Sequence, residues 1–297
     1  MEFIIKNFKR FKTILNINKI INTFMKQLLK LTSIVLAIAI ISACSGESKK
    51  SNNNDSVLTQ IKKEQVKEDV TEFVYPMPTA FEVAKMLNRI GAGYIFSLSN
   101  SSENAEKYFT EKSKALNLGI YSADLSYAST YNQKQIAMDY LEASNKLIEE
   151  LGFADAVDKD LIDKIEKVEN DKDQLIDIFT NTFYDTYEYL NKIDRGSISM
   201  LILIGTYVEG LYIATHISED TFNNIEMVKI IMDQKEPLAK LLSVVENFED
   251  NADVKEKYEL LVKLNTIYSG MEAGSISQEQ LAAITNEIAV IRKGIVE

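Results

Sequence analysis

The feature that most constrains this chain is the apolar stretch SISMLILIGTYVEGLYIATHI at 197–217. A helix that is apolar on all sides belongs either in the centre of a domain or in a membrane. Thr206, Tyr207 and Glu209 disfavour the membrane, because polar groups are costly in lipid. We therefore predict a core helix, with Gly205 and Gly210 allowing neighbouring helices to approach closely.

The rest of the chain from residue 78 onward also has helical character. Its apolar residues recur every three or four positions, and no run shows the alternation of a strand. Gly and Pro are scarce, with 11 and 3 residues in 297, and hydrophobic residues make up 46% of the chain. These features predict an all-α fold: a single globular domain over 78–297, with roughly eight to ten helices around the helix at 197–217.

Several local boundaries can be predicted within this domain. Gly119 is expected to stop a helix that ends near Leu118. A break is expected at 129–132, and YIFSL at 94–98 is expected to be buried. Ser277 and Gln280 have the spacing of a capping box that begins the last helix.

A membrane-targeting signal precedes the domain. Lys26 and Lys30 lead into an apolar run at 34–41, and small residues then come directly before Cys44, which is the typical order of a secretory signal. The run is too short to span a bilayer as a helix, which needs about 20 apolar residues. The quartet at 41–44, ISAC, resembles the bacterial lipobox. The resemblance implies a diacylglyceryl thioether on Cys44, cleavage before it, and an acylated amino terminus with chains such as palmitate. The alternative is an uncleaved anchor with an incidental cysteine.

The resulting organisation has three parts: a signal peptide at 1–43, a lipidated flexible tether at 44–77, and the helical domain. Residues 1–24 are either a mis-assigned start, with translation beginning at Met25, or a long basic leader; we favour the first. Ser45 stands where some lipoproteins carry the aspartate that retains them at the inner membrane. By that analogy we expect the protein at the outer membrane, on either its periplasmic or its external face.

Charge and composition limit the kinds of partner that the protein can bind. Of 33 Lys and Arg, seven precede Cys44, as does one of 44 acidic residues, so the chain from Cys44 onward has 26 basic and 43 acidic residues and a formal net charge of −17. Such a surface repels nucleic acid, which we do not expect as a partner. With one cysteine and one histidine, a His/Cys metal cluster is excluded by count, and no cofactor is indicated. The expected partners are the membrane, through Cys44, and an envelope protein or small ligand.

Glu209 on the core helix would be costly to bury without a partner. Only Arg89, Arg195 and Arg292 follow Cys44, and Arg89 lies in a largely apolar helix. We predict that Arg89 pairs inside the domain with Glu209 or with Asp124. The alternative is a ligand pocket with Glu209 at its floor, because perturbed carboxylates arise in both settings.

A second polar group lies on the helix around residue 124. Tyr121, Asp124 and Tyr127 are spaced by three and therefore lie along one side of a helix. This face favours a half-buried seam between two helices, with a groove for a small molecule or peptide as the alternative. With Arg89, Tyr207 and Glu209, these residues form the candidate ligand-binding or structural cluster.

Catalytic signals are weak. His216 permits a Ser/His/Asp relay in principle, but the chain lacks a Gly-x-Ser-x-Gly elbow. A carboxylate pair for glycoside hydrolysis fits the many acids but is disfavoured by the absence of tryptophan, on which sugars commonly stack, and by the chain length. We assign no catalytic residue.

Two stretches carry a resemblance to a known class of proteins. LNLGIYSADLSY at 116–127 and YVEGLY at 207–212 resemble segments of helical lipoproteins from Gram-negative bacteria of the Bacteroidota type. The resemblance implies an envelope location and a helical fold over most of the chain, without a mechanism.

Three functions follow for testing. The leading hypothesis is an envelope-anchored lipoprotein whose helical domain is a non-enzymatic binding or scaffold module. The second is a hydrolase with a site near Glu209, Asp124 or His216. The third is a purely structural envelope component.

Overall fold

A computed structural model describes residues 80–297 apart from 158–159, 169–170 and 273. The chain divides into two units, Met1–Asp55 and Ser56–Glu297, and the described residues all belong to the second. The predicted signal peptide at 1–43, Cys44 and the tether at 44–77 lie outside the described residues.

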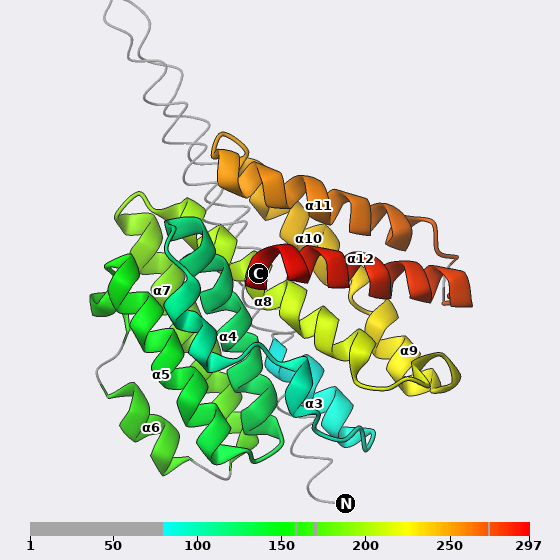
Figure 1. The fold of residues 1–297 in the computed structure, drawn as a ribbon, viewed down its shortest axis with the longest axis horizontal. Coiled ribbons are helices and arrows are strands. Elements are labelled where there is room, and N and C mark those ends of the chain that lie inside the picture. Colours follow the sequence, from blue (N-terminus) through cyan, green and yellow to red (C-terminus); the bar gives the residue numbers. More distant parts are fainter. Residues whose placement is uncertain (1–79, 158–159, 169–170, 273) are drawn as a thin grey trace, which may run out of the picture. The chain divides into compact units, whose positions relative to one another are not determined.

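Within these ranges the fold is all-α, with ten α-helices and no strand (Figure 1). This confirms the predicted fold class. The helices, in chain order, are α3 (Ala80–Arg89), α4 (Glu111–Thr130), α5 (Lys134–Leu151), α6 (Leu161–Lys167), α7 (Lys172–Lys192), α8 (Gly196–His216), α9 (Ile225–Met232), α10 (Lys235–Val245), α11 (Ala252–Ser269) and α12 (Gln278–Val296).

The core helix predicted at 197–217 is α8. It contacts α3, α4, α7 and α9 to α12, so it is the element around which this unit is built. It is the one helix in the described part of the chain that is long and apolar enough to cross a membrane. However, 89% of its most apolar 18-residue stretch is buried inside the protein. Its apolar surface is therefore satisfied by neighbouring helices.

A close helix crossing brings α4 and α8 together at two glycines. A Cβ built on Gly119 would lie 2.7 Å from the Thr206 nitrogen and closer still to the Ile202 carbonyl oxygen. One on Gly205 would clash with the Leu116 carbonyl oxygen. The prediction that Gly119 ends a helix is therefore wrong: it lies inside α4, where its missing side chain allows the two backbones to approach.

Other helix boundaries match the sequence signals. The predicted break at 129–132 is confirmed, since α4 ends at Thr130 and Asn132 has a left-handed φ of 58°. Gly152 ends α5 with φ 76°. Ser277 and Gln280 form the predicted capping box of α12.

Residues 91–110, here named the connecting segment, join α3 to α4 without an α-helix. They contain two 3₁₀ turns, Phe96–Leu98 and Ser102–Lys107. The prediction that 94–98 is buried is wrong: Phe96 is 62% exposed, Ser97 is exposed, and the other three residues are only partly buried. The backbone of this segment hydrogen-bonds to Tyr121, Asp124 and Tyr127 of the candidate cluster.

Candidate functional site

Glu209 is held by an arginine, as its complete burial requires. It lies on α8 with no exposed surface, and Arg292 of α12 binds it through two hydrogen bonds, Nε to Oε2 at 2.6 Å and Nη2 to Oε1 at 2.8 Å. Burial raises the pKa of Glu209, and the Arg292 guanidinium opposes that shift. Burial alone would lower the pKa of Arg292, but the same carboxylate raises it above its usual value. The paired geometry favours a charged pair.

Asp124 of α4 completes what we call the carboxyl cluster: Asp124, Glu209 and Arg292. Asp124 is fully buried, and its Oδ2 accepts a hydrogen bond from the Asn100 N–H at 3.0 Å. Burial raises the pKa of Asp124 well above its usual value; the Glu209 charge adds to the shift and Arg292 opposes it. Two carboxyl groups without exposed surface therefore share one guanidinium, whose side chain is 12% exposed.

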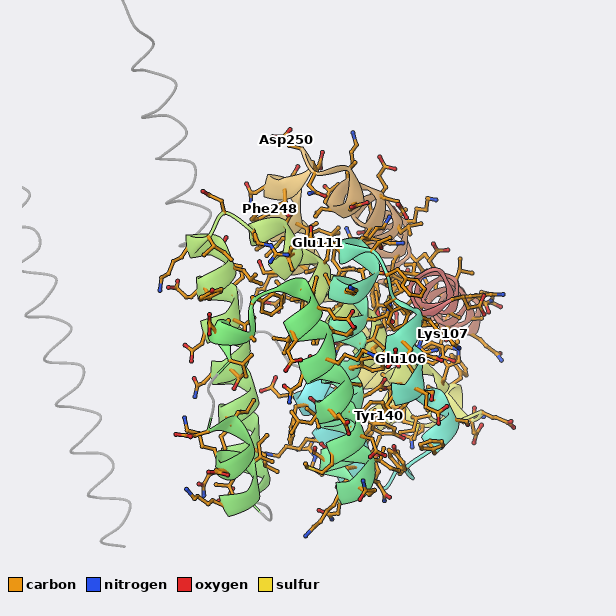
Figure 2. All side chains as sticks on the ribbon, turned by 60° about the vertical axis from the view of Figure 1, so that its left-hand side comes forward. Glu106, Lys107, Glu111, Tyr140, Phe248 and Asp250 are labelled. Atoms are coloured by element: carbon orange, nitrogen blue, oxygen red, sulfur yellow. The ribbon has the colours of Figure 1, made fainter. Side chains whose placement is uncertain are left out.

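The predicted pairing of Arg89 with Glu209 or Asp124 is wrong. Arg89 is the last residue of α3 and its side chain is exposed. Arg292 takes the predicted role because it faces α8 from the last turns of α12, on the same side as the buried Ile288, Ile291 and Ile295. The third arginine, Arg195, pairs with Glu111, the first residue of α4, which Figure 2 labels.

Tyr121 and Tyr127 lie on the predicted face of α4 with Asp124, and both are fully buried. The ring of Tyr121 lies 5.9 Å from that of Tyr140, which Figure 2 labels on α5. The ring of Tyr127 lies 4.7 Å from that of Tyr94, whose pKa burial raises to about 12. The face is thus a packed seam against α5 and the connecting segment, fully buried rather than half-buried as expected, with the phenols neutral.

The buried polar side chains converge on the backbone of the connecting segment. Tyr127 Oη accepts a hydrogen bond from the Ile95 N–H at 2.8 Å, and Tyr121 Oη donates to the Ser101 carbonyl at 2.9 Å. Arg292 Nη2 donates to the Leu98 carbonyl at 2.9 Å, and Asp124 accepts from Asn100 as above. Four side chains from α4 and α12 therefore hydrogen-bond to backbone groups of a segment that contains no α-helix or strand.

Tyr207 does not join this cluster. It lies two residues from Glu209, and residues at that spacing point to different sides of a helix. Its hydroxyl donates to the Gln234 carbonyl at 3.3 Å. Burial raises its pKa, with Tyr268 as the second cause.

His216 lies at the outer end of a stack rather than beside the carboxyls. Its ring stacks on Tyr212 at 4.0 Å between centroids, and the Arg292 guanidinium carbon lies 4.1 Å from the centre of the same Tyr212 ring. Burial lowers the pKa of His216, while a hydrogen bond to the Tyr212 carbonyl opposes the shift and Arg292 adds to it. Of the three hydrolase candidates, Asp124 and Glu209 are brought together, and His216 is engaged elsewhere.

The sequence reasoning missed Arg292 and the asparagines under the connecting segment. Asn100 is buried and donates to Tyr108 Oη at 2.9 Å and to Asn117 Oδ1 at 3.3 Å. Asn117 Nδ2 in turn donates to the Ile295 carbonyl at 2.9 Å. One signal was present for Arg292, since it follows Ile284, Ile288 and Ile291 on the apolar stripe of the last helix.

Within the described ranges no group of three or more His, Cys, Asp or Glu side chains is arranged to hold a metal ion. Comparison with protein-family models, with curated proteins and with solved structures finds no match to this chain. The resemblance to envelope lipoproteins stays a prediction from the sequence.

Proposed function

We propose that this protein is a lipid-anchored, non-enzymatic binding module of the cell envelope, and that the connecting segment is its contact surface for a protein partner. The lipobox at Cys44 carries the anchoring part of the proposal. The binding part depends on one observation: three buried side chains of α4 and the partly exposed Arg292 of α12 hold the backbone of an irregular segment in place.

A rigid irregular segment on a helical scaffold is a common way to build a binding surface. The connecting segment exposes two phenylalanines, Phe96 at 62% and Phe109 at 84%. Aromatic side chains contribute strongly to protein interfaces, and a surface that is already ordered loses little entropy on binding. The geometry therefore favours a protein partner over a ligand held in the core.

The arrangement of the acids argues against a hydrolase at this place. Asp124 and Glu209 have no exposed surface, and both oxygens of Glu209 already accept hydrogen bonds from Arg292. A general acid or base must come within hydrogen-bonding distance of its substrate. A substrate would have to separate α8, α12 and the connecting segment to reach these groups.

The test is photocrosslinking in intact cells with the full-length protein. A photoreactive amino acid would replace Phe96, and in a second variant it would replace Val290 of α12. The two positions are matched in exposure, at 62% and 64%. We expect a discrete protein adduct from position 96 and none of the same size from position 290.

Two further results would bear on the proposal. Excess protein without the photoreactive residue should reduce the yield of the adduct. The same excess of a Phe96→Ser variant should not. Equal labelling from both positions, or turnover of a defined substrate by purified protein that is lost in Glu209→Gln, would contradict the proposal.

A further inference from the structure

One oxygen of the carboxyl cluster has no hydrogen-bond donor if both acids are ionised. Asp124 Oδ2 has a donor in Asn100, but Asp124 Oδ1 is buried with no hydrogen-bond donor. A buried carboxylate oxygen without a donor is costly, at about 1–3 kcal/mol or more. The Glu209 and Asp124 carboxyl groups act on each other's pKa, but two ionised carboxylates are both acceptors and cannot hydrogen-bond to each other.

We infer that Asp124 and Glu209 share one proton in the folded protein, carried on Asp124 Oδ1 and donated to the Glu209 carboxylate. Each carboxyl oxygen of the cluster then has a partner. Glu209 accepts from Arg292 and from Asp124, and Asp124 accepts from Asn100 and donates to Glu209.

The charge count supports the same assignment. One guanidinium faces two carboxyl groups that have no exposed surface, so two ionised acids would leave a net negative charge in the core. One proton makes the cluster neutral. It belongs on Asp124, because Glu209 forms both hydrogen bonds to Arg292, whereas Arg292 acts on Asp124 through its charge alone.

The other groups that face Asp124 do not replace this proton. They are phenols from the connecting segment, α4 and α5, all kept neutral by burial and all acted on by the Asp124 charge: Tyr94, Tyr108, Tyr121, Tyr127 and Tyr140. Tyr121 and Tyr127 already use their hydroxyls on the connecting segment. The proton is therefore shared between Asp124 and Glu209 and not with a tyrosine.

The proton on Asp124 makes the free energy of unfolding fall as pH rises. The folded protein holds the Asp124 proton to a higher pH than the unfolded chain, where an aspartate titrates near its usual pKa. Between those two pKa values the folded state binds more protons, so the stability from this group is present in acid and is lost as pH rises through the folded pKa.

An amide swap tests the assignment. Asparagine at 124 copies protonated aspartic acid, with an oxygen for the Asn100 N–H and an NH₂ for Glu209, and it needs no proton. We expect Asp124→Asn to unfold at a urea midpoint equal to or above that of the parent protein, with an advantage that grows as pH rises from the usual pKa of an aspartate toward the raised pKa of Asp124. Glu209→Gln should lower the midpoint at every pH, because it removes the carboxylate from Arg292.

A spectroscopic readout separates this role from a purely steric one. Infrared spectra of the folded parent protein at neutral pH should contain the C=O stretch of a protonated carboxylic acid, and Asp124→Asn should lack it. The opposite order of stabilities would place the proton on Glu209 and overturn the assignment. So would a parent spectrum without that band, or Asp124→Asn destabilised by the same amount at all pH values.

Discussion

At the scale of single residues, the fate of Glu209 depends on which arginine reaches it. A buried carboxylate left without its partner is strongly destabilising, more so than loss of an exposed pair. Arg292 contributes two hydrogen bonds to Glu209, one to the Leu98 carbonyl and a stacking contact on Tyr212. Arg89, on the exposed end of α3, contributes none of these.

The two arginines therefore form a matched pair for mutation. We expect Arg292→Met to lower the free energy of unfolding by about 3–5 kcal/mol, because it leaves Glu209 uncompensated in the core. Arg89→Met should change it by less than about 0.5 kcal/mol, as is usual for an exposed side chain. Urea denaturation followed by circular dichroism measures both. Equal effects of the two substitutions would mean that Arg292 does not stabilise the core through Glu209.

At the scale of helices, the packing of α4 on α8 depends on two residues that have no side chain. Gly119 and Gly205 face each other across the crossing, where a Cβ on Gly205 would lie 3.2 Å from the Gly119 Cα. This approach also places Asp124 of α4 near Glu209 of α8. The crossing distance and the carboxyl cluster are consequently coupled.

Substituting these glycines tests the coupling. Gly119→Ala should lower the free energy of unfolding by about 1–3 kcal/mol or more, because the added methyl group meets backbone that cannot move aside easily. Gly294→Ala is the control, since Gly294 lies inside α12 and nothing beyond the neighbouring backbone of that helix lies within 4 Å of the position that a Cβ would take there. It should be neutral or stabilise by up to about 1 kcal/mol. Thermal unfolding of both variants would show the difference, and similar midpoints would argue against a tight crossing.

At the scale of the whole molecule, the proposed lipid anchor and the helical domain lie in different parts of the sequence. The described domain contains no cysteine, so its folding depends on packing around α8 rather than on a disulfide. The proposed anchor lies at Cys44, 36 positions before the first described residue, Ala80. Membrane attachment and domain stability should therefore respond to different substitutions.

Cys44→Ser tests this separation. We expect the variant to move from the membrane fraction to the soluble fraction, while the urea midpoint of the helical domain stays within error of the parent protein. Ser45→Ala is the control and should stay with the membrane. Intact mass of the parent protein should show acyl chains on a chain that begins at Cys44, and an unmodified thiol with the leader attached would refute the lipoprotein assignment.

Much of the fold was predictable because its signals are local. Helical spacing, the capping box at Ser277 and the all-apolar composition of α8 each depend on neighbouring residues in the chain. The face of Tyr121, Asp124 and Tyr127 was predictable for the same reason. Gly119 misled the sequence reasoning, because a glycine that ends a helix and one that admits another helix look the same in a single sequence.

The sequence by itself determined the helical class, the identity of the core helix and the need of Glu209 for a cationic partner, since these follow from composition and spacing. Only the tertiary structure decided that the partner is Arg292, 83 residues away, that Asp124 shares the site, and that the buried side chains hold the connecting segment. The physical reason is that charge pairing and backbone satisfaction act through space. The pairing depends on how closely α4, α8 and α12 pack, and neither spacing nor composition records that distance.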